Sequence, residues 1–219
     1  MIIDLVSTDA LSAIQLIYAA KTRGLEFHTV WIVNRSPSDC RPLFDYARIG
    51  RFELRFIASH ASPDLANDLR ARGVSLLMQI GSVMIRKELR EATSIGVLNL
   101  HAGLLPRYRG LESATWAVLE GGTHGVTAHL LAAGVDTGPI VLTETVAWVD
   151  GEDLAQLLAR THNQHKWQVF VRAALALRDG QVVPRPQAPD EGRQYFAPHP
   201  RLVALAQERL GRTLSPKPQ

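Results

Sequence analysis

Cysteine is almost absent from the sequence, and the single one, Cys40, has no partner for an internal disulfide. The first residues also lack the basic and long apolar segments of a signal peptide, and no stretch approaches the roughly 18 apolar residues that span a bilayer. These absences argue against a disulfide-stabilised secreted protein and against a membrane protein. We therefore expect a cytoplasmic protein with no membrane partner.

The sequence also lacks a large excess of positive or negative charge. The 24 Lys and Arg residues are nearly balanced by 21 Asp and Glu, and the basic residues form no consecutive run. This pattern argues against a general nucleic-acid binder, so we expect no nucleic-acid partner. With 46% hydrophobic and 21% charged residues in 219, the composition instead fits one α/β domain with a full core and excludes a disordered chain.

The first half of the sequence alternates short apolar runs with helical patterns. We expect strands at residues 2–6, 28–33, 54–58, 74–80 and 97–100, with helices between most of them. The runs are continuously apolar, which is typical of strands buried on both faces. This order predicts an α/β fold with a doubly wound, mostly parallel sheet.

The second half departs from this alternation. We expect a helix at 113–120, added edge strands at 126–131 and 140–146, a long helix at about 153–178 and a short helix around 202–210. We predict that residues 1–180 form one domain. Residues 181–219 would be a short C-terminal extension packed on that domain rather than an independent domain.

Two polar side chains lie at the end of the apolar strand expected at 97–100. Asn99 and His101 are two residues apart, so they project to the same side at the carboxyl end of a strand, where ligands bind in open α/β sheets. A neutral imidazole can accept a proton, and an amide can donate to a developing oxyanion, so the pair suits acyl-type transfer. A histidine satisfied at a strand end beside a turn asparagine is the alternative interpretation.

Three blocks in order give this pair a context: residues 99–110, then Gly-Val-Thr-Ala-His at 125–129, then Gly-Val-Asp-Thr-Gly-Pro-Ile at 134–140. Together they resemble the signature of the folate-dependent formyltransferases, which include glycinamide ribonucleotide transformylase, methionyl-tRNA formyltransferase and the sugar N-formyltransferases. The resemblance is tight over residues 97–141 and looser over 1–180. It implies a Rossmann-like formyltransferase catalytic domain at 1–180.

The resemblance also implies a mechanism. Members of this family move the formyl group of 10-formyltetrahydrofolate to an amine with an Asn, His, Asp set, which falls here on Asn99, His101 and Asp136. Asn99 would donate to the oxyanion, His101 would assist that charge and the proton movements, and Asp136 would orient His101 and help relay a proton. Without the other blocks, a turn aspartate in a Gly-rich loop is the preferred interpretation of Asp136.

The cofactor site follows from the same resemblance. The family binds the pterin against two loops, which correspond to about residues 78–85 and 132–138. The implied contacts are Met78, Ile80, Gly81, Val83, Ala132, Val135 and Gly138. A buried strand end would explain the apolar residues of the first loop equally well. No metal site is expected.

Two departures from the family pattern concern the catalytic blocks. Gly103 stands where the family usually has Ser, which removes a hydroxyl beside the active-site loop. Asp136 lies 35 positions after His101, about one fewer than expected, and the missing residue is assigned to the turn at 121–125.

The acceptor is predicted by elimination. Glycinamide ribonucleotide transformylases resemble one another in a Gly-rich phosphate loop, whereas the loop at 7–12 has no glycine and places Asp9 there, either at an acceptor site or as a helix cap. Methionyl-tRNA formyltransferases share a C-terminal tRNA-holding domain, and the 29 residues after Asp190 are too few for one. We expect a small amine, foremost an amino sugar nucleotide, with glycinamide ribonucleotide and hydroxyornithine as alternatives.

Several residues could contact such an acceptor. The candidates are Ser7, Asp9, Arg107, Tyr108 and Arg109, followed by the aromatic Trp116, Tyr195 and Phe196 and the polar His162, Gln164 and His165. Arginines in loops are also common as solvated charges or backbone braces, and aromatic residues as core. A non-catalytic folate-binding protein and a formyltetrahydrofolate hydrolase stay open as alternatives, and a homodimer is compatible with the sequence.

Overall fold

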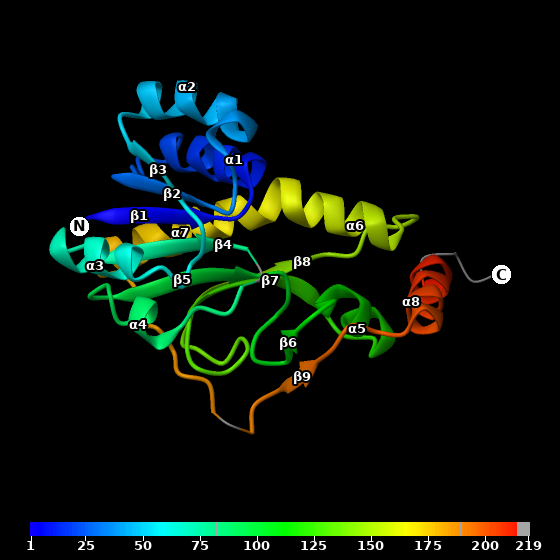
Figure 1. The fold of residues 1–219 in the computed structure, drawn as a ribbon. Helices are drawn as coiled ribbons and strands as arrows, with labels where there is room; N and C mark the ends of the chain where they lie inside the picture. The colour runs from blue at the N-terminus through cyan, green and yellow to red at the C-terminus, as the bar shows by residue number, and fades with distance from the viewer. Residues whose placement is uncertain (82, 189, 214–219) are drawn as a thin grey trace.

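A seven-stranded sheet runs through the molecule in the order β3-β2-β1-β4-β5-β7-β8 (Figure 1). The computed structural model describes residues 1–81, 83–188 and 190–213. The first five strands are parallel, and the last two are antiparallel additions at one edge. The strands are β1 (Ile3–Ser7), β2 (Thr29–Val33), β3 (Glu53–Ile57), β4 (Leu76–Ile80), β5 (Gly96–His101), β7 (His124–Leu130) and β8 (Ile140–Val146). The predicted doubly wound, mostly parallel sheet with added edge strands is confirmed.

Helices cover both faces of this sheet. One face packs against α1 (Ala10–Lys21), α2 (Arg41–Gly50) and α7 (Trp167–Arg178), and the other against α3 (Pro63–Ala71) and α4 (Lys87–Arg90). A third apolar cluster joins α5 (Ser113–Leu119), α6 (Leu154–Arg160) and α8 (Pro200–Thr213). The structure also contains the short η1 (Pro37–Cys40) and the small parallel pair β6 (Tyr108–Gly110) and β9 (Arg193–Tyr195).

The long helix expected at 153–178 is divided by a π-helical turn, η2 (Thr161–Lys166). Two histidines of this turn reach partners on different elements: His162 Nε2 lies 3.1 Å from Gln15 Oε1, and His165 Nδ1 lies 2.7 Å from Glu144 Oε1. A π turn holds an extra residue and so shifts the phase of the helix. The polar run at 161–166 therefore marks a change of helix phase that the apolar pattern did not predict.

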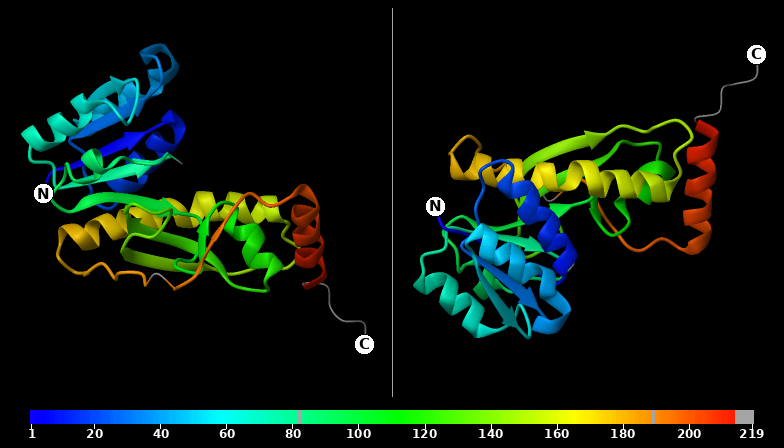
Figure 2. Two further views of the ribbon diagram at one scale, coloured as in Figure 1. Left: turned by 60° about the horizontal axis from the view of Figure 1, so that its bottom comes forward. Right: turned by 90° about the horizontal axis from the view of Figure 1, so that it is seen from above.

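The residues after α7 run back along the side of the molecule that carries β6 and end in α8 beside α5 (Figures 1 and 2). An isolated antiparallel bridge joins Arg185 to Ile140, and β9 pairs with β6. These contacts place the extension against the rest of the chain. The domain boundary at residue 180 stays a prediction.

The sheet brings the candidate residues to one edge. The parallel strands β1, β4 and β5 end side by side, and the antiparallel β7 places His129 opposite Asn99 and Thr127 opposite His101. The loop at 131–139 then joins β7 to β8 next to these strand ends. Within the described part of the chain, no helix has the length and apolar character needed to cross a membrane.

His124, at the start of β7, is fully buried near the ring of Trp148. Its Nε2 lies 3.2 Å from Thr161 Oγ1, and its Nδ1 has no hydrogen-bond partner among the residues that the structure describes. Burial, together with the charge of Arg160, lowers its pKa to about 4. The folded protein therefore resists protonation of this ring.

We expect the free energy of unfolding to fall as the pH drops from about 6.5 toward 4, because the unfolded chain binds a proton on His124 that the folded chain excludes. For this residue alone the loss at pH 5 is about 2 kcal/mol. His124→Phe keeps the aromatic packing and removes the titration, so the stability difference between pH 7 and pH 5 should shrink by that amount in urea unfolding. An unchanged difference would contradict the prediction.

Candidate active site

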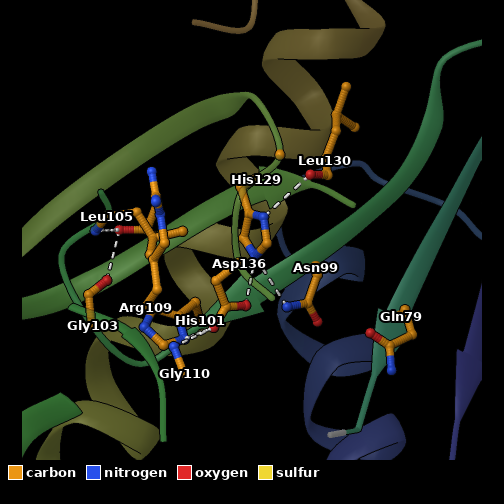
Figure 3. Close-up of polar contacts among 12 residues, drawn as sticks. Gln79, Asn99, His101, Gly103, Leu105, Arg109, Gly110, His129, Leu130 and Asp136 are labelled. Carbon is orange, nitrogen blue, oxygen red and sulfur yellow. Dashed lines mark hydrogen bonds and ion pairs between the residues drawn. The ribbon is translucent and has the colours of Figure 1, made fainter. Parts of the chain in front are cut away.

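The carboxylate of Asp136 is the centre of the candidate site (Figure 3). Its Oδ2 accepts a hydrogen bond from the backbone N–H of Gly110 at 2.8 Å and lies 3.3 Å from His101 Nδ1. Its Oδ1 lies 3.4 Å from His129 Nε2. The carboxylate thus sits between two imidazole rings and is held by a third group from β6.

The two strand residues predicted from the sequence lie on either side of this carboxylate. His101 ends β5 and contacts Asp136 directly, while Asn99 Nδ2 lies 3.2 Å from His129 Nε2 (Figure 3). Asn99, His101 and Asp136 are therefore brought together at the carboxyl edge of the sheet, as the sequence blocks predict. His129 links the amide to the carboxylate.

Burial and charge oppose each other in this cluster. Burial lowers the pKa of His101, which is 8% exposed, and the Asp136 charge raises it without overcoming burial. Burial alone would raise the pKa of Asp136, but the contacts with His129, His101 and the Gly110 N–H hold it below the usual value. The arrangement is therefore a neutral imidazole beside an ionised carboxylate, which suits proton transfer near neutral pH.

The far side of the His101 ring meets two oxygen atoms. Nε2 lies 2.6 Å from the carbonyl oxygen of Tyr108 and 3.0 Å from Ser113 Oγ. Both ring nitrogens are therefore engaged, which fixes the ring plane.

Glycine is required at position 103 by this crowding. A Cβ on Gly103 would lie 2.6 Å from His101 Nε2 and 2.6 Å from Ser113 Cβ, closer than real Cβ contacts come. The carbonyl of Gly103 accepts a hydrogen bond from Thr127 Oγ1 at 2.7 Å, so the backbone is also anchored. The departure from the family's usual serine thus has a steric basis.

Three neighbours of the site were not singled out by the sequence. His129 lies in the second block and faces Asn99 across the β5–β7 pair, so strand register could have identified it. Ser113 and Gln187 carried no signal, because their roles depend on how α5 and the C-terminal extension pack.

The predicted cofactor contacts fall into two groups. Met78 and Ile80 are buried in the core under the helices, so β4 offers a ligand only its backbone there. Gly81 has a φ of 132° and Val83 is 41% exposed, both just past the end of β4.

The other predicted contacts, Ala132, Val135 and Gly138, lie in the loop that carries Asp136. Among the described residues, no protein acceptor meets the backbone N–H of Ala132 or Val135. Backbone donors without a protein acceptor, beside half-buried apolar side chains, are what a flat heterocycle with polar edges requires, so Ala132 and Val135 fit a pterin.

Most predicted acceptor contacts are already occupied. The Ser7 hydroxyl is buried and donates to the backbone of Asp9, whose carboxylate in turn accepts from Ser12 N–H at 2.8 Å as the cap of α1. Tyr108 is 1% exposed and packs 5.8 Å from the Tyr195 ring. Of Ser7, Asp9 and Tyr108, Asp9 alone has a side chain that is partly open to solvent.

The two arginines of the first block also point to other partners. Arg109 is buried, and its Nε and Nη2 donate to Gln187 Oε1 at 3.1 and 3.0 Å. Gln187 Nε2 donates to the carbonyls of Asp136 and Gly138, so Arg109 braces the Asp136 loop. Arg107 is exposed and lies 3.5 Å from Glu120.

An Asn, His, Asp cluster lies at the carboxyl edge of a doubly wound sheet. The chain belongs to the formyl transferase family, whose model matches residues 2–174. The family membership expected from the three blocks is thereby confirmed.

Individual relatives give a similar result. The chain is 33% identical over 139 residues to methionyl-tRNA formyltransferase of Trichlorobacter lovleyi, covering 63% of this chain and 43% of that one. It is 38% identical over 114 residues to the same enzyme of Parvibaculum lavamentivorans, covering 52% and 36%. The chain thus spans less than half the length of these curated relatives.

Solved structures are similar over more of their length. Glycinamide ribonucleotide transformylase 1 from Symbiobacterium toebii matches with a TM-score of 0.68 and 25% identity over 86% of this chain and 93% of that one. The formyltransferase PseJ from Anoxybacillus kamchatkensis, in complex with UDP-4,6-dideoxy-4-formamido-L-AltNAc and tetrahydrofolate, matches with a TM-score of 0.58 and 23% identity over 76% and 85%. The second likeness concerns the fold alone.

We expect Asp136→Asn to lower the pKa of His101 further, because the substitution removes the negative charge that opposes the effect of burial. NMR titration of 15N-labelled histidine measures this pKa in the folded protein. Asp150→Asn, which changes an exposed carboxylate, is the matched control and should leave the titration in place. A His101 pKa that rises or stays constant in Asp136→Asn would refute the assigned contact.

Proposed function

We propose that this chain is an N-formyltransferase that moves the formyl group of 10-formyltetrahydrofolate to the primary amine of a small acceptor. The observation that carries the proposal is the cluster of Asn99, His101 and Asp136, with 3.3 Å between the imidazole and the carboxylate. Membership of the formyl transferase family supports the same reaction class.

The donor supplies a formyl carbon bound to nitrogen, which an amine can attack. Asn99 Nδ2 carries two hydrogens and lies 3.2 Å from His129 Nε2, and one of these hydrogens can donate to the negative charge that develops on the formyl oxygen. His101 and Asp136 take up the proton that the attacking amine loses. The nitrogen that leaves the formyl carbon receives a proton in return, so the overall transfer is balanced.

For the acceptor we propose an amino sugar nucleotide. The Asp9 carboxylate already fills the N-terminus of α1, where a phosphate-binding loop would hold its anion, and a second negative charge there would be repelled. This argues against a phosphate group at that position. Glycinamide ribonucleotide is the second candidate, supported by the likeness to the Symbiobacterium toebii enzyme.

The remaining proposals concern the setting of the enzyme. We propose a cytoplasmic location, no nucleic-acid partner and a homodimer. The free backbone donors at Ala132 and Val135 support binding of the folate pterin at the Asp136 loop.

His101→Ala should lower turnover by about a hundredfold or more, because the proton-transferring group is lost, while folate affinity stays within a few fold. Asn99→Ala should do the same through loss of the oxyanion donor. Steady-state kinetics and folate titration measure the two quantities. His28 precedes β2 and so lies at the amino end of the parallel strands, away from the site. His28→Ala is therefore the control, and its activity should be unchanged. Parallel loss of folate binding and turnover would reassign the altered side chain to cofactor positioning, and full turnover of His101→Ala would refute the mechanism.

The acceptor is tested by incubating the protein with 10-formyltetrahydrofolate and, separately, amino sugar nucleotides, hydroxyornithine, glycinamide ribonucleotide and methionyl-tRNA. Release of tetrahydrofolate is followed, with His101→Ala as the blank. We expect the highest kcat/KM with an amino sugar nucleotide. Efficient turnover of glycinamide ribonucleotide or methionyl-tRNA, with the amino sugars inert, would overturn the acceptor proposal. Tetrahydrofolate release without any amine would indicate the hydrolase alternative.

A further inference from the structure

Among the described residues, one side-chain hydroxyl, that of Ser113, lies within hydrogen-bond distance of the His101 ring. Ser113, the first residue of α5, is 4% exposed, and its Oγ lies 3.0 Å from His101 Nε2 and 3.2 Å from the carbonyl oxygen of Tyr108. That carbonyl is itself 2.6 Å from Nε2. The hydroxyl therefore has two possible acceptors within reach.

The other partners of the ring can only accept hydrogen bonds. Nδ1 faces the Asp136 carboxylate and Nε2 faces the Tyr108 carbonyl. A neutral imidazole carries one N–H, so one of its nitrogens would present a lone pair to an oxygen acceptor. Among the described residues, Ser113 is the one hydrogen-bond donor next to Nε2.

We propose that Ser113 is a positioning residue that holds His101 in its neutral form, with the ring proton on Nδ1 toward Asp136. When the Ser113 hydroxyl donates to Nε2, the lone pair of the neutral ring has a donor that offsets the Tyr108 carbonyl oxygen 2.6 Å away. When Nε2 gains a proton, the hydroxyl turns to the Tyr108 carbonyl and the ring keeps its place. The protonation state of His101 thus changes without a rearrangement of the site.

The position of Ser113 is linked to Gly103. A Cβ at residue 103 would lie 2.7 Å from Ser113 Oγ as well as 2.6 Å from Nε2, so a side chain there would displace this hydroxyl. Gly103 therefore leaves room for Ser113, which belongs to α5. The position of the Ser113 hydroxyl depends on the glycine.

The titratable groups around the ring are few. Asp136, from the loop after β7, raises the pKa of His101, and His129 on β7 opposes it. His124 on β7 also interacts with the ring electrostatically. Of the described residues, β6 and α5 meet the ring with the uncharged Tyr108 carbonyl, which also raises the pKa of His101, and with the Ser113 hydroxyl, so removal of the hydroxyl leaves the charges unchanged.

The test is Ser113→Ala. Loss of the donor destabilises neutral His101, so we expect its pKa to rise and its proton affinity to increase about tenfold, the effect of one lost hydrogen bond. In spectra of 15N-labelled histidine, the neutral Nδ1–H tautomer should be the main neutral form in the unaltered protein and be lost in the variant. The acid limb of the kcat/KM profile should move up by about one pH unit. KM for folate should stay constant.

Three further variants make the test specific. Ser113→Thr retains the hydroxyl and should keep the titration of the unaltered protein. Ser113→Cys supplies a weaker donor and should shift the titration in the same direction by less, which answers the question if Ser113→Ala does not fold. Ser62→Ala, which removes the serine before α3, is the matched control. An unchanged His101 titration and tautomer in Ser113→Ala or Ser113→Cys would overturn the proposal, even if turnover fell.

The inference rests on the proposed function for its kinetic consequence, but the two can fail separately. The histidine titration needs neither donor nor acceptor, so it decides the role of Ser113 even if no amine is formylated. Full activity of His101→Ala would refute the proposed function and leave the titration result intact.

Discussion

The contact between the Asp136 carboxylate and its three neighbours is the interaction on which the site depends. Asp136 has a φ of 52°, in the left-handed region that a non-glycine residue adopts at a cost of about 1 kcal/mol or more. The hydrogen bond from the Gly110 N–H and the contacts with His101 and His129 offset this strain. The left-handed backbone places the carboxylate beside both His101 on β5 and His129 on β7.

Much of the fold and part of the site could be predicted because they depend on local pattern. Buried parallel strands read as continuous apolar runs, and Asn99 and His101 sit at a strand end whose direction the alternation determines. Asp136 required the resemblance to a family, because a turn aspartate has no local signature. Its position beside His101 results from the antiparallel pairing of β7 with β5 and β8.

The rest could not be predicted because it depends on packing between distant segments. Arg109 is typical of an anion-binding loop residue, yet pairing of β6 with β9 buries it against Gln187. Met78 is a predicted cofactor contact, but a central strand covered on both faces turns its side chain into the core. Ser113 approaches His101 only because α5 begins beside Gly103.

The hydrogen bonds of Gln187 connect the Asp136 loop to a segment that is synthesised later. A chain synthesised from its amino end can pair β1 to β5 early, but the carbonyls of Asp136 and Gly138 receive their donor only after residue 187 has emerged. The Asp136 loop is therefore completed late in synthesis. A nascent chain therefore holds Asn99, His101 and Asp136 before it holds the residue that braces the Asp136 loop.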